Sequence, residues 1–374
     1  MKQGKSIIQL ALELERQRQA RKDFIADTRS LQVKTKDGWS QLSIKMDKLE
    51  ESFWLNEVAH KQLAERLQIP QKYYHKMRFE YPSLLDENIN AWLGKNPERR
   101  MIRTLDGHAR AFLSDRYRRL DNLELADAVI PIIKEMKGAE IVSCDITETH
   151  MYIKVINKKL KAEVAVNDVV QAGIVISNSE VGLGSLKVEP LIYRLVCKNG
   201  MIVKDYAQKR YHVGKQVESE EPAYEIYSDE TLQADDRAFF LKVQDTVRCA
   251  VDEAKFMLTV ERLQAAKTDF TGSDPIKTVE LLADQYVLYQ NERGSILRHF
   301  LMNGDSSRYG LINAVTRASQ DIEDYNRATQ LERLGGELLA LPVKLFTPVK
   351  VIPAIERNVS NIIPRDIPKL TTGA

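Results

Sequence analysis

The stretch IRTLDGHARAFLSDRYRRLDN, residues 102–122, decides the fold class. It holds two runs of alternating apolar and polar residues, and Asp106-Gly107 separates them. Such alternation is typical of β-strands, and Asp-Gly between two runs favours a two-residue type I′ hairpin turn. Asp121, followed three residues later by Glu124, is typical of a helix start. We therefore predict a hairpin followed by a helix.

The helix after this hairpin has an apolar face, because Leu123, Ala126, Ile130 and Ile133 recur at helical spacing. Pro131 should kink it or end its regular part. Short alternating runs continue beyond it, divided by turn residues, whereas both ends of the chain follow a helical pattern. The predicted fold class is α+β: a central curved, mostly antiparallel sheet of hairpins packed with helices, flanked by N- and C-terminal helical regions.

Shifts in pattern divide the chain into six predicted segments. They are a charged helical arm at 1–40 (one helix over 5–24), a helical subdomain at 41–98, a β-rich core domain with one helix at 99–217, an acidic linker at 218–230, a helical C-terminal region at 231–340 and a proline-rich extended tail at 341–374.

Two helical stretches carry more detailed expectations. AHKQLAERLQIPQKYYHKM, residues 59–77, resembles the first two helices of a helix-turn-helix, and its alternative is an ordinary packed helix pair. Near the C-terminus, a long helix should begin near Leu311 and end at Gly335-Gly336.

Composition is that of a folded globular protein. The chain has 374 residues, 43% of them hydrophobic and 29% charged, and a net charge of only +2, so the total charge does not identify a partner. Its three cysteines form no CxxC pair, which favours a reducing cytoplasm over a disulfide framework. No signal peptide is expected, and no apolar run is long enough to span a bilayer, so no membrane partner is expected.

Signals for enzyme chemistry are weak. The glycines of GLGS, residues 182–185, follow a strand pattern rather than lead a helix, which is atypical of a nucleotide-binding loop. The six histidines are scattered, without zinc-ligand spacing. No catalytic residue, metal or cofactor is predicted; whether the protein is an enzyme stays open, with a non-enzymatic role preferred.

The first hairpin is strongly basic. A two-residue turn at Asp106-Gly107 pairs Arg103 with Arg110, and an anion shared between them would offset their repulsion. From residue 99 to 119 there are seven arginines against two aspartates, and Phe112 offers a ring for stacking unpaired bases. The alternative is a solvated strand face on which arginines pair with aspartates.

A second basic ribbon is predicted around YRLVCKNGMIV, residues 193–203. A type I′ turn at Asn199-Gly200 places Cys197 opposite Ile202 among apolar neighbours, so Cys197 is expected to be structural rather than nucleophilic. The two ribbons together give the predicted nucleic-acid-binding residues: Arg99, Arg100, Arg103, Arg110, Phe112, Arg116, Arg118, Arg119, Arg194, Lys198, Lys204, Lys209 and Arg210.

Four motifs in order resemble the phage/plasmid-like protein family, domain of unknown function 932. They are LLDENINAWL (84–93), IRTLDGHARAFLSDRYRRLDN (102–122), ISNSEVGLGSLKVEPLIYRLVCKNGMI (176–202) and YGLINAVTRASQ (309–320). The resemblance implies a phage, plasmid or prophage setting, and it supplies no catalytic residues.

These observations favour a non-catalytic, cytoplasmic nucleic-acid-binding protein, with single-stranded DNA as the expected polymer and binding or annealing in recombination as the role. The N-terminal helix could serve a homo-oligomer. The alternative is a structural or protein-interaction protein of a phage or prophage, including host defence or counter-defence, whose basic ribbons contact an acidic partner or the acidic run at 218–230. A phosphodiesterase ranks third, because it would need a metal cluster.

Overall fold

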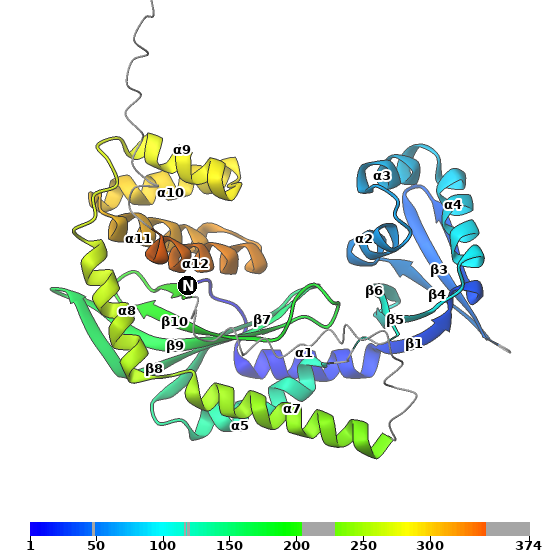
Figure 1. The fold of residues 1–374 in the computed structure, drawn as a ribbon, viewed down its shortest axis with the longest axis horizontal. Helices are drawn as coiled ribbons and strands as arrows, with labels where there is room; N and C mark the ends of the chain where they lie inside the picture. The colour runs from blue at the N-terminus through cyan, green and yellow to red at the C-terminus, as the bar shows by residue number, and fades with distance from the viewer. Residues whose placement is uncertain (47–48, 116, 118–119, 204–228, 342–374) are drawn as a thin grey trace, which may run out of the picture.

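The structure is a computed structural model, which describes residues 1–46, 49–115, 117, 120–203 and 229–341. Its strands form two separate sheets with helices packed on both (Figure 1). The predicted α+β class is confirmed, but the strands divide into two sheets instead of one central sheet.

The first sheet has six strands in the order β1-β5-β6-β4-β3-β2. Its neighbours pair antiparallel, except that β4 and β6 are parallel. The strands are β1 (Lys22–Asp27), β2 (Leu31–Lys36), β3 (Trp39–Met46), β4 (Leu49–Leu55), β5 (Arg99–Leu105) and β6 (His108–Ser114), and a short 3-10 helix, η1 (Thr28–Ser30), joins β1 to β2.

Strict alternation explains which face of the outer strands is buried. In β2 and β3, Val33, Leu42 and Ile44 point inward, whereas their neighbours along each strand are polar and either exposed or half-buried. Three helices supply the opposing apolar surface: α2 (Glu57–Arg66), α3 (Gln71–Glu80) and α4 (Pro82–Lys95). Leu63 of α2 and Met77 of α3 lie in the same core cluster.

The edge strand β2 is protected by side chains of α4. The amide of Asn90 accepts a hydrogen bond from Val33 N at 2.8 Å and donates one to Val33 O at 2.9 Å. Asp86 Oδ2 accepts from Thr35 N at 2.8 Å. These bonds satisfy backbone groups that an edge strand would otherwise offer to another chain.

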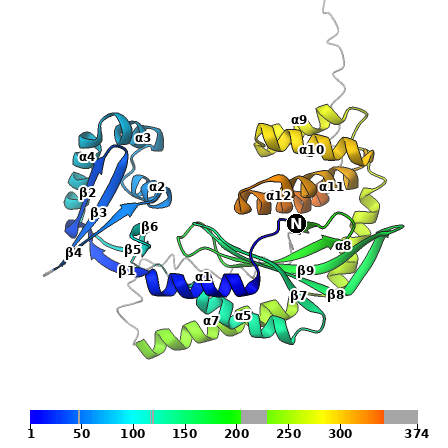
Figure 2. The same ribbon diagram turned by 180° about the vertical axis from the view of Figure 1, so that it is seen from behind.

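The second sheet has five antiparallel strands in the order β11-β10-β9-β8-β7. They are β7 (Ala139–Ile146), β8 (Met151–Ala165), β9 (Asp168–Asn178), β10 (Lys187–Arg194) and β11 (Asn199–Ile202). One face is covered by α1 (Ile7–Ala20), α5 (Asn122–Glu135) and α7 (Asp229–Cys249), as Figures 1 and 2 show from opposite sides.

The remaining helices pack at the other side and end of this sheet. They are α8 (Glu253–Ala266), α9 (Pro275–Tyr286), α10 (Gln290–Asn303), α11 (Arg308–Ala318), η3 (Ser319–Asp321) and α12 (Tyr325–Ala340). Phe256 of α8 joins the core formed with Val170 and Ala172 of β9, whereas Tyr325 of α12 packs on Tyr152 of β8.

Several predicted elements differ from the observed ones. The sequence predicted helix up to residue 24 and a helical subdomain from 41, but residues 22–27, 31–36, 39–46 and 49–55 form strands. The hairpin of 99–114 belongs to the first sheet. Helix α5 continues through Pro131 to Glu135. Helix α7 begins at Asp229, inside the predicted acidic linker, and residues 218–228 and the tail from 342 lie outside the described residues.

The predicted long helix near the C-terminus is in fact two helices, α11 and α12, with η3 between them. The prediction that the helix ends at Gly335-Gly336 was wrong, because α12 continues to Ala340. Both glycines serve close packing: a Cβ at Gly335 would lie against the Thr316 side chain, and one at Gly336 against the carbonyl oxygen of Ile202. Glycine therefore lets α12 approach α11 and β11 closely.

Candidate nucleic-acid interface

The first predicted hairpin is present, with a different register. Asp106 and Gly107 have φ of 50° and 75°, as a type I′ turn requires, and Leu105 pairs with His108 as predicted. A β-bulge then shifts the pairing, so that Arg103 lies opposite Ala111. The prediction that Arg103 and Arg110 face each other was therefore wrong.

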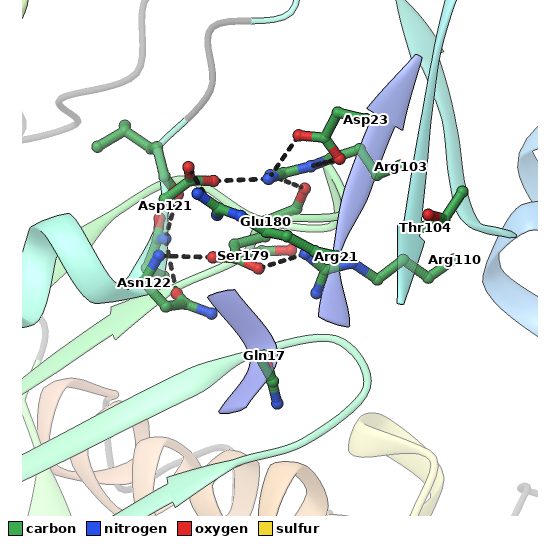
Figure 3. Close-up of polar contacts among 12 residues, drawn as sticks. Gln17, Arg21, Asp23, Arg103, Thr104, Arg110, Asp121, Asn122, Ser179 and Glu180 are labelled. Carbon is green, nitrogen blue, oxygen red and sulfur yellow. Dashed lines mark hydrogen bonds and ion pairs between the residues drawn. The ribbon is translucent and has the colours of Figure 1, made fainter. Parts of the chain in front are cut away.

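Arg103 is fully buried among carboxylates instead of lying on a solvent-facing ribbon (Figure 3). Its Nη2 lies 2.6 Å from Asp121 Oδ1 and 3.2 Å from Asp23 Oδ2, and its Nη1 donates to the carbonyl oxygen of Glu180 at 3.0 Å. Burial would lower the pKa of this guanidinium, but the facing carboxylates raise it above its ordinary value. Arg103 is therefore charged and satisfied by the chain itself.

Glu180 makes a second buried link. Its Oε2 lies 2.6 Å from Arg110 Nη2, and its Oε1 accepts a hydrogen bond from Asn122 N at 2.6 Å. Asp121 occupies the predicted N-cap position of α5, but its side chain makes no cap hydrogen bond and instead pairs with Arg103 and Arg21. Glu180 thus caps the helix that Asp121 was expected to cap.

We call Arg21, Asp23, Arg103, Arg110, Asp121 and Glu180 the ionic joint. These three arginines and three carboxylates come from the first sheet, the end of α1, the start of α5 and the loop after β9. Burial alone would raise the pKa of the Asp121 carboxyl, but Arg103 and Arg21 hold that pKa below its usual value. The anion expected between Arg103 and Arg110 is thus supplied by carboxylates of the chain, and the joint fastens the first sheet to the second.

Other predicted binding residues are also occupied or buried. Phe112 is in the core of the first sheet, only 5% exposed. Arg100 Nε lies 2.8 Å from Glu98 Oε1, and Arg194 Nε lies 2.6 Å from Asp168 Oδ1.

Two of the predicted binding residues, Arg99 and Lys198, are exposed on separate sheets. The other six, Arg116, Arg118, Arg119, Lys204, Lys209 and Arg210, lie outside the described residues. The described members of the predicted set therefore form no continuous basic surface.

The second hairpin turns earlier than predicted. Asn199 and Gly200 belong to β11, where they pair with Arg194 and Tyr193 of β10, so residues 195–198 form the turn. Asn199 is buried and its Nδ2 donates to Thr316 Oγ1 at 2.6 Å, which ties β11 to α11. This use of its side chain explains why Asn199 stands in a strand.

Cys197 is half-buried in this turn, and Ile202 pairs with Leu191, so the prediction that Cys197 lies opposite Ile202 was wrong. Its carbonyl oxygen accepts hydrogen bonds from Arg317 Nη1 at 2.7 Å and from Gln320 Nε2 at 3.1 Å. The residue therefore helps through its backbone to fix the turn against the end of α11.

A different exposed surface lies on the first sheet, opposite α2, α3 and α4. We call it the open sheet face. Trp39 is 61% exposed and Trp54 is 41% exposed. The outward positions of the three outer strands are otherwise polar: Gln32, Lys34, Lys36, Gln41, Ser43, Lys45, Glu50 and Ser52.

The strand register arranges these side chains in rows. Lys34, Gln41 and Trp54 are neighbours across β2, β3 and β4, and Lys36 pairs with Trp39 in the next row. Trp39 is therefore a diagonal neighbour of Trp54, about 7–8 Å away on an ideal sheet. Two indole rings lie next to two lysines on one surface.

Positive charge on the open sheet face is not neutralised within the described part of the chain. There, Lys34, Lys36 and Lys45 form no ion pair, and Glu50, the cross-strand neighbour of Lys45, is the acidic residue of this face. Three lysines against one glutamate favour an anionic ligand.

Sequence reasoning missed this surface although a signal was present. Asp37-Gly38 separates LQVKTK from WSQLSIKM, two alternating runs, as Asp106-Gly107 does in the first predicted hairpin. Asp37 and Gly38 have φ of 51° and 79°, as a type I′ turn requires. Because residues 1–98 were expected to be mainly helical, the hairpin with Asp37-Gly38 at its turn was not predicted.

Two general findings apply to the described ranges alone. In these ranges no three His, Cys, Asp or Glu side chains are grouped so that they could hold a metal ion. None of the helices there combines the length and the apolar character needed to cross a membrane.

Comparison with known proteins gives a family. By its structure, this chain is a two-sheet α+β protein with an ionic joint and an open sheet face. Residues 111–317 match the model of a domain of unknown function (DUF932), and because this is more than half of the 374 residues, the chain belongs to that family. This confirms the resemblance read from the motifs. No curated protein and no solved structure matches the chain.

Proposed function

We propose that this protein binds single-stranded nucleic acid, without catalysis, on the open sheet face. The observation that supports this most is the pair Trp39 and Trp54, which stand exposed on a sheet surface whose opposite side carries the helices and core. Neighbouring exposed apolar groups with a polar rim are typical of an interaction site. Here the ring pair lies among lysines, as expected for a polyanion with flat, apolar bases.

The chemistry of this surface favours unpaired bases. A base can stack on an exposed indole only if its own face is free, which is not so inside a duplex. Each such contact contributes about 1–3 kcal/mol and tolerates any base. Lys34, Lys36 and Lys45 supply cations for the phosphates between the stacked bases.

The proposal also includes the cellular role of the protein and the type of nucleic acid that it binds. Membership of the family and its resemblance to phage and plasmid proteins support a role in the cytoplasm during replication or recombination of a phage, prophage or plasmid. Single-stranded DNA is the proposed polymer, and annealing of two strands is the proposed activity. Binding of an acidic protein by the same lysines is the competing role, and it would not need the tryptophan rings.

Self-association is proposed through α1. Leu10 and Leu14 anchor this helix inside the molecule, whereas Ile8 and Leu12, one turn apart, are 69% and 68% exposed. This exposed pair could meet the same pair of a second copy, and the mass measured by light scattering for Ile8→Lys with Leu12→Lys tests it.

The direct test is binding of a labelled oligo-dT strand, measured by fluorescence anisotropy. Trp54→Ala should weaken binding about 5- to 150-fold, as loss of one stacked base predicts. Trp92→Ala is the matched control, because Trp92 is also 41% exposed but lies on α4, across the sheet, with Lys95 Nζ 5.1 Å from its ring centroid. Its affinity should stay within about twofold of wild type.

Three outcomes would contradict the proposal. Equal loss in both tryptophan variants would mean that neither ring is specifically involved. If Trp54→Ala leaves binding intact while Lys72→Ala with Tyr73→Ala removes it, the exposed side of α3 is the binding surface and the helix-turn-helix alternative is favoured. Retained binding to polyglutamate with none to oligo-dT would favour an acidic protein partner.

A further inference from the structure

The line of exposed rings on the first sheet extends beyond Trp54 to β6. His108 is the direct cross-strand neighbour of Trp54, where β4 and β6 pair in parallel. Both side chains point away from the helices, because the next pair along these strands, Leu55 and Ala109, lies in the core of the first sheet. His108 is exposed, and its Nδ1 lies 3.0 Å from the carbonyl oxygen of Asp106. An imidazole therefore stands one strand spacing, about 4.8 Å, from Trp54.

At the other end, Phe79 of α3 continues the line beyond the tip of the hairpin formed by β2 and β3. Its ring lies against the turn, since a Cβ at Gly38 would be 2.5 Å from the ring edge. Trp39 follows Gly38 directly, so the indole and the phenyl ring flank the same turn. Phe79 is 63% exposed, although His75 stacks on it with the ring centroids 6.2 Å apart. Glycine at position 38 is what lets this ring reach the turn.

We call these four exposed rings, which come from β6, β4, β3 and α3, the aromatic track: His108, Trp54, Trp39 and Phe79. Polar side chains lie beside the rings. Gln41 is the cross-strand neighbour of Trp54, and Lys34 lies next to Gln41 in the same row. Lys36 is the cross-strand neighbour of Trp39, with Asp37 of the turn as the acidic residue beside it. A protein partner favours a continuous apolar centre, whereas rings placed among polar and cationic groups favour bases joined by phosphates.

We propose that one unpaired strand of nucleic acid crosses the first sheet along the aromatic track, at right angles to the β-strands. Successive bases stack on the four rings, and Lys34 and Lys36 meet the phosphates between them. The inference rests on the proposed function and deepens it in two ways. It adds His108 and Phe79 to the stacking residues, and it defines the substrate as an unpaired stretch of about four nucleotides or more, one base for each ring.

The test measures oligo-dT binding by fluorescence anisotropy for variants at the two ends of the track. Phe79→Ala and His108→Ala should each weaken binding about 5- to 150-fold, as loss of one stacked base predicts. Phe270→Ala is the matched control, because Phe270 is 57% exposed but lies outside the first sheet, where its backbone bridges to Ser307. Its affinity should stay within about twofold of wild type.

The outcomes separate this inference from the proposed function. If Trp54→Ala weakens binding but Phe79→Ala or His108→Ala does not, the track is overturned while the proposed function stands. Equal loss in Phe270→Ala would also overturn the track. If the wild-type protein does not bind oligo-dT, both proposals fail.

Photocrosslinking of the wild-type protein gives a second measurement that does not depend on how the variants fold. The probe is oligo-dT that carries 5-bromodeoxyuridine, and the adducts are located by mass spectrometry of peptides. Adducts should be found at Phe79 and His108 as well as at the two tryptophans. Adducts confined to Trp39 and Trp54 would overturn the track.

Discussion

Arg103 Nη2 lies 2.6 Å from Asp121 Oδ1, and this contact joins a strand of the first sheet to the residue that precedes α5 under the second sheet. Both side chains are buried, and each has a further partner of opposite charge, Asp23 for Arg103 and Arg21 for Asp121. A buried ion pair of this kind specifies how two units meet, while removal of one partner leaves a costly buried charge.

Loss of one member of the ionic joint should therefore destabilise the protein. We expect Arg103→Met to lower the free energy of unfolding by about 3–5 kcal/mol, because Asp23 and Asp121 would remain buried without their shared cation. Urea unfolding followed by circular dichroism measures this. Arg99→Met, at an exposed position of the same strand, should change stability by less than about 0.5 kcal/mol. A stable Arg103→Met protein would show that the joint contributes little to holding the sheets together.

Acid should destabilise the first sheet through His60. This histidine is buried in α2 with its Nδ1 2.7 Å from the Tyr74 hydroxyl, and burial lowers its pKa from 6.5 to about 3. Between these two values the unfolded chain binds a proton that the folded chain does not, so stability falls as pH decreases from 6.5 towards 3.

The variant His60→Gln isolates this contribution. Between pH 6.5 and 4.5 the titration costs about 2.3 kcal/mol, so the variant should lose about 2 kcal/mol less than wild type over that range. Urea midpoints at several pH values measure it. His75→Gln, on the exposed side of α3, should retain the wild-type loss. Identical pH profiles for wild type and His60→Gln would argue against a neutral, buried His60.

Close packing of α12 on β11 predicts opposite effects for two helical glycines. Gly336→Ala should destabilise by about 1–3 kcal/mol, because the new methyl would meet the carbonyl oxygen of Ile202. Gly294→Ala lies on α10 with open space around it, and it should stabilise by about 0.5–1 kcal/mol through helix propensity alone. Thermal unfolding distinguishes the two, and stabilisation by both substitutions would contradict this close approach.

Local patterns predicted the elements whose geometry depends on a few neighbouring residues. Asp106-Gly107 gave the correct turn and α5 begins after Asp121, as predicted. The predicted register beyond the turn was wrong, because a bulge shifts the pairing. In the structure Arg110 binds Glu180, which lies 70 residues later in the chain. Partners at that separation leave no periodic signal in the sequence.

The candidate site was misplaced for the same reason. A local excess of arginine does not reveal buried carboxylates from distant segments. The predicted basic ribbon therefore contributes Arg103 and Arg110 to the ionic joint instead of to a binding surface. The open sheet face was predictable from Asp37-Gly38 and the alternation around it, but helical spacing in the first residues was extended too far along the chain. Exposure of Trp39 and Trp54 could not be known without knowing which face the helices cover.

The salt dependence of binding should identify which cations contact the polymer. If Lys34, Lys36 and Lys45 each neutralise one phosphate, replacing all three by glutamine should reduce the slope of log K against log salt by about 2, from the value of about 0.7 per contact in single strands. Folding should survive, because all three side chains point to solvent and form no ion pair among the described residues. The matched control replaces Lys61, Lys72 and Lys95 by glutamine, which removes the same total charge from the helical side of the first sheet. Anisotropy titrations of oligo-dT at four salt concentrations give both slopes. A slope that falls equally in the two variants would mean that the lysines act only through net charge, and a slope unchanged in the sheet-face variant would place the phosphates elsewhere.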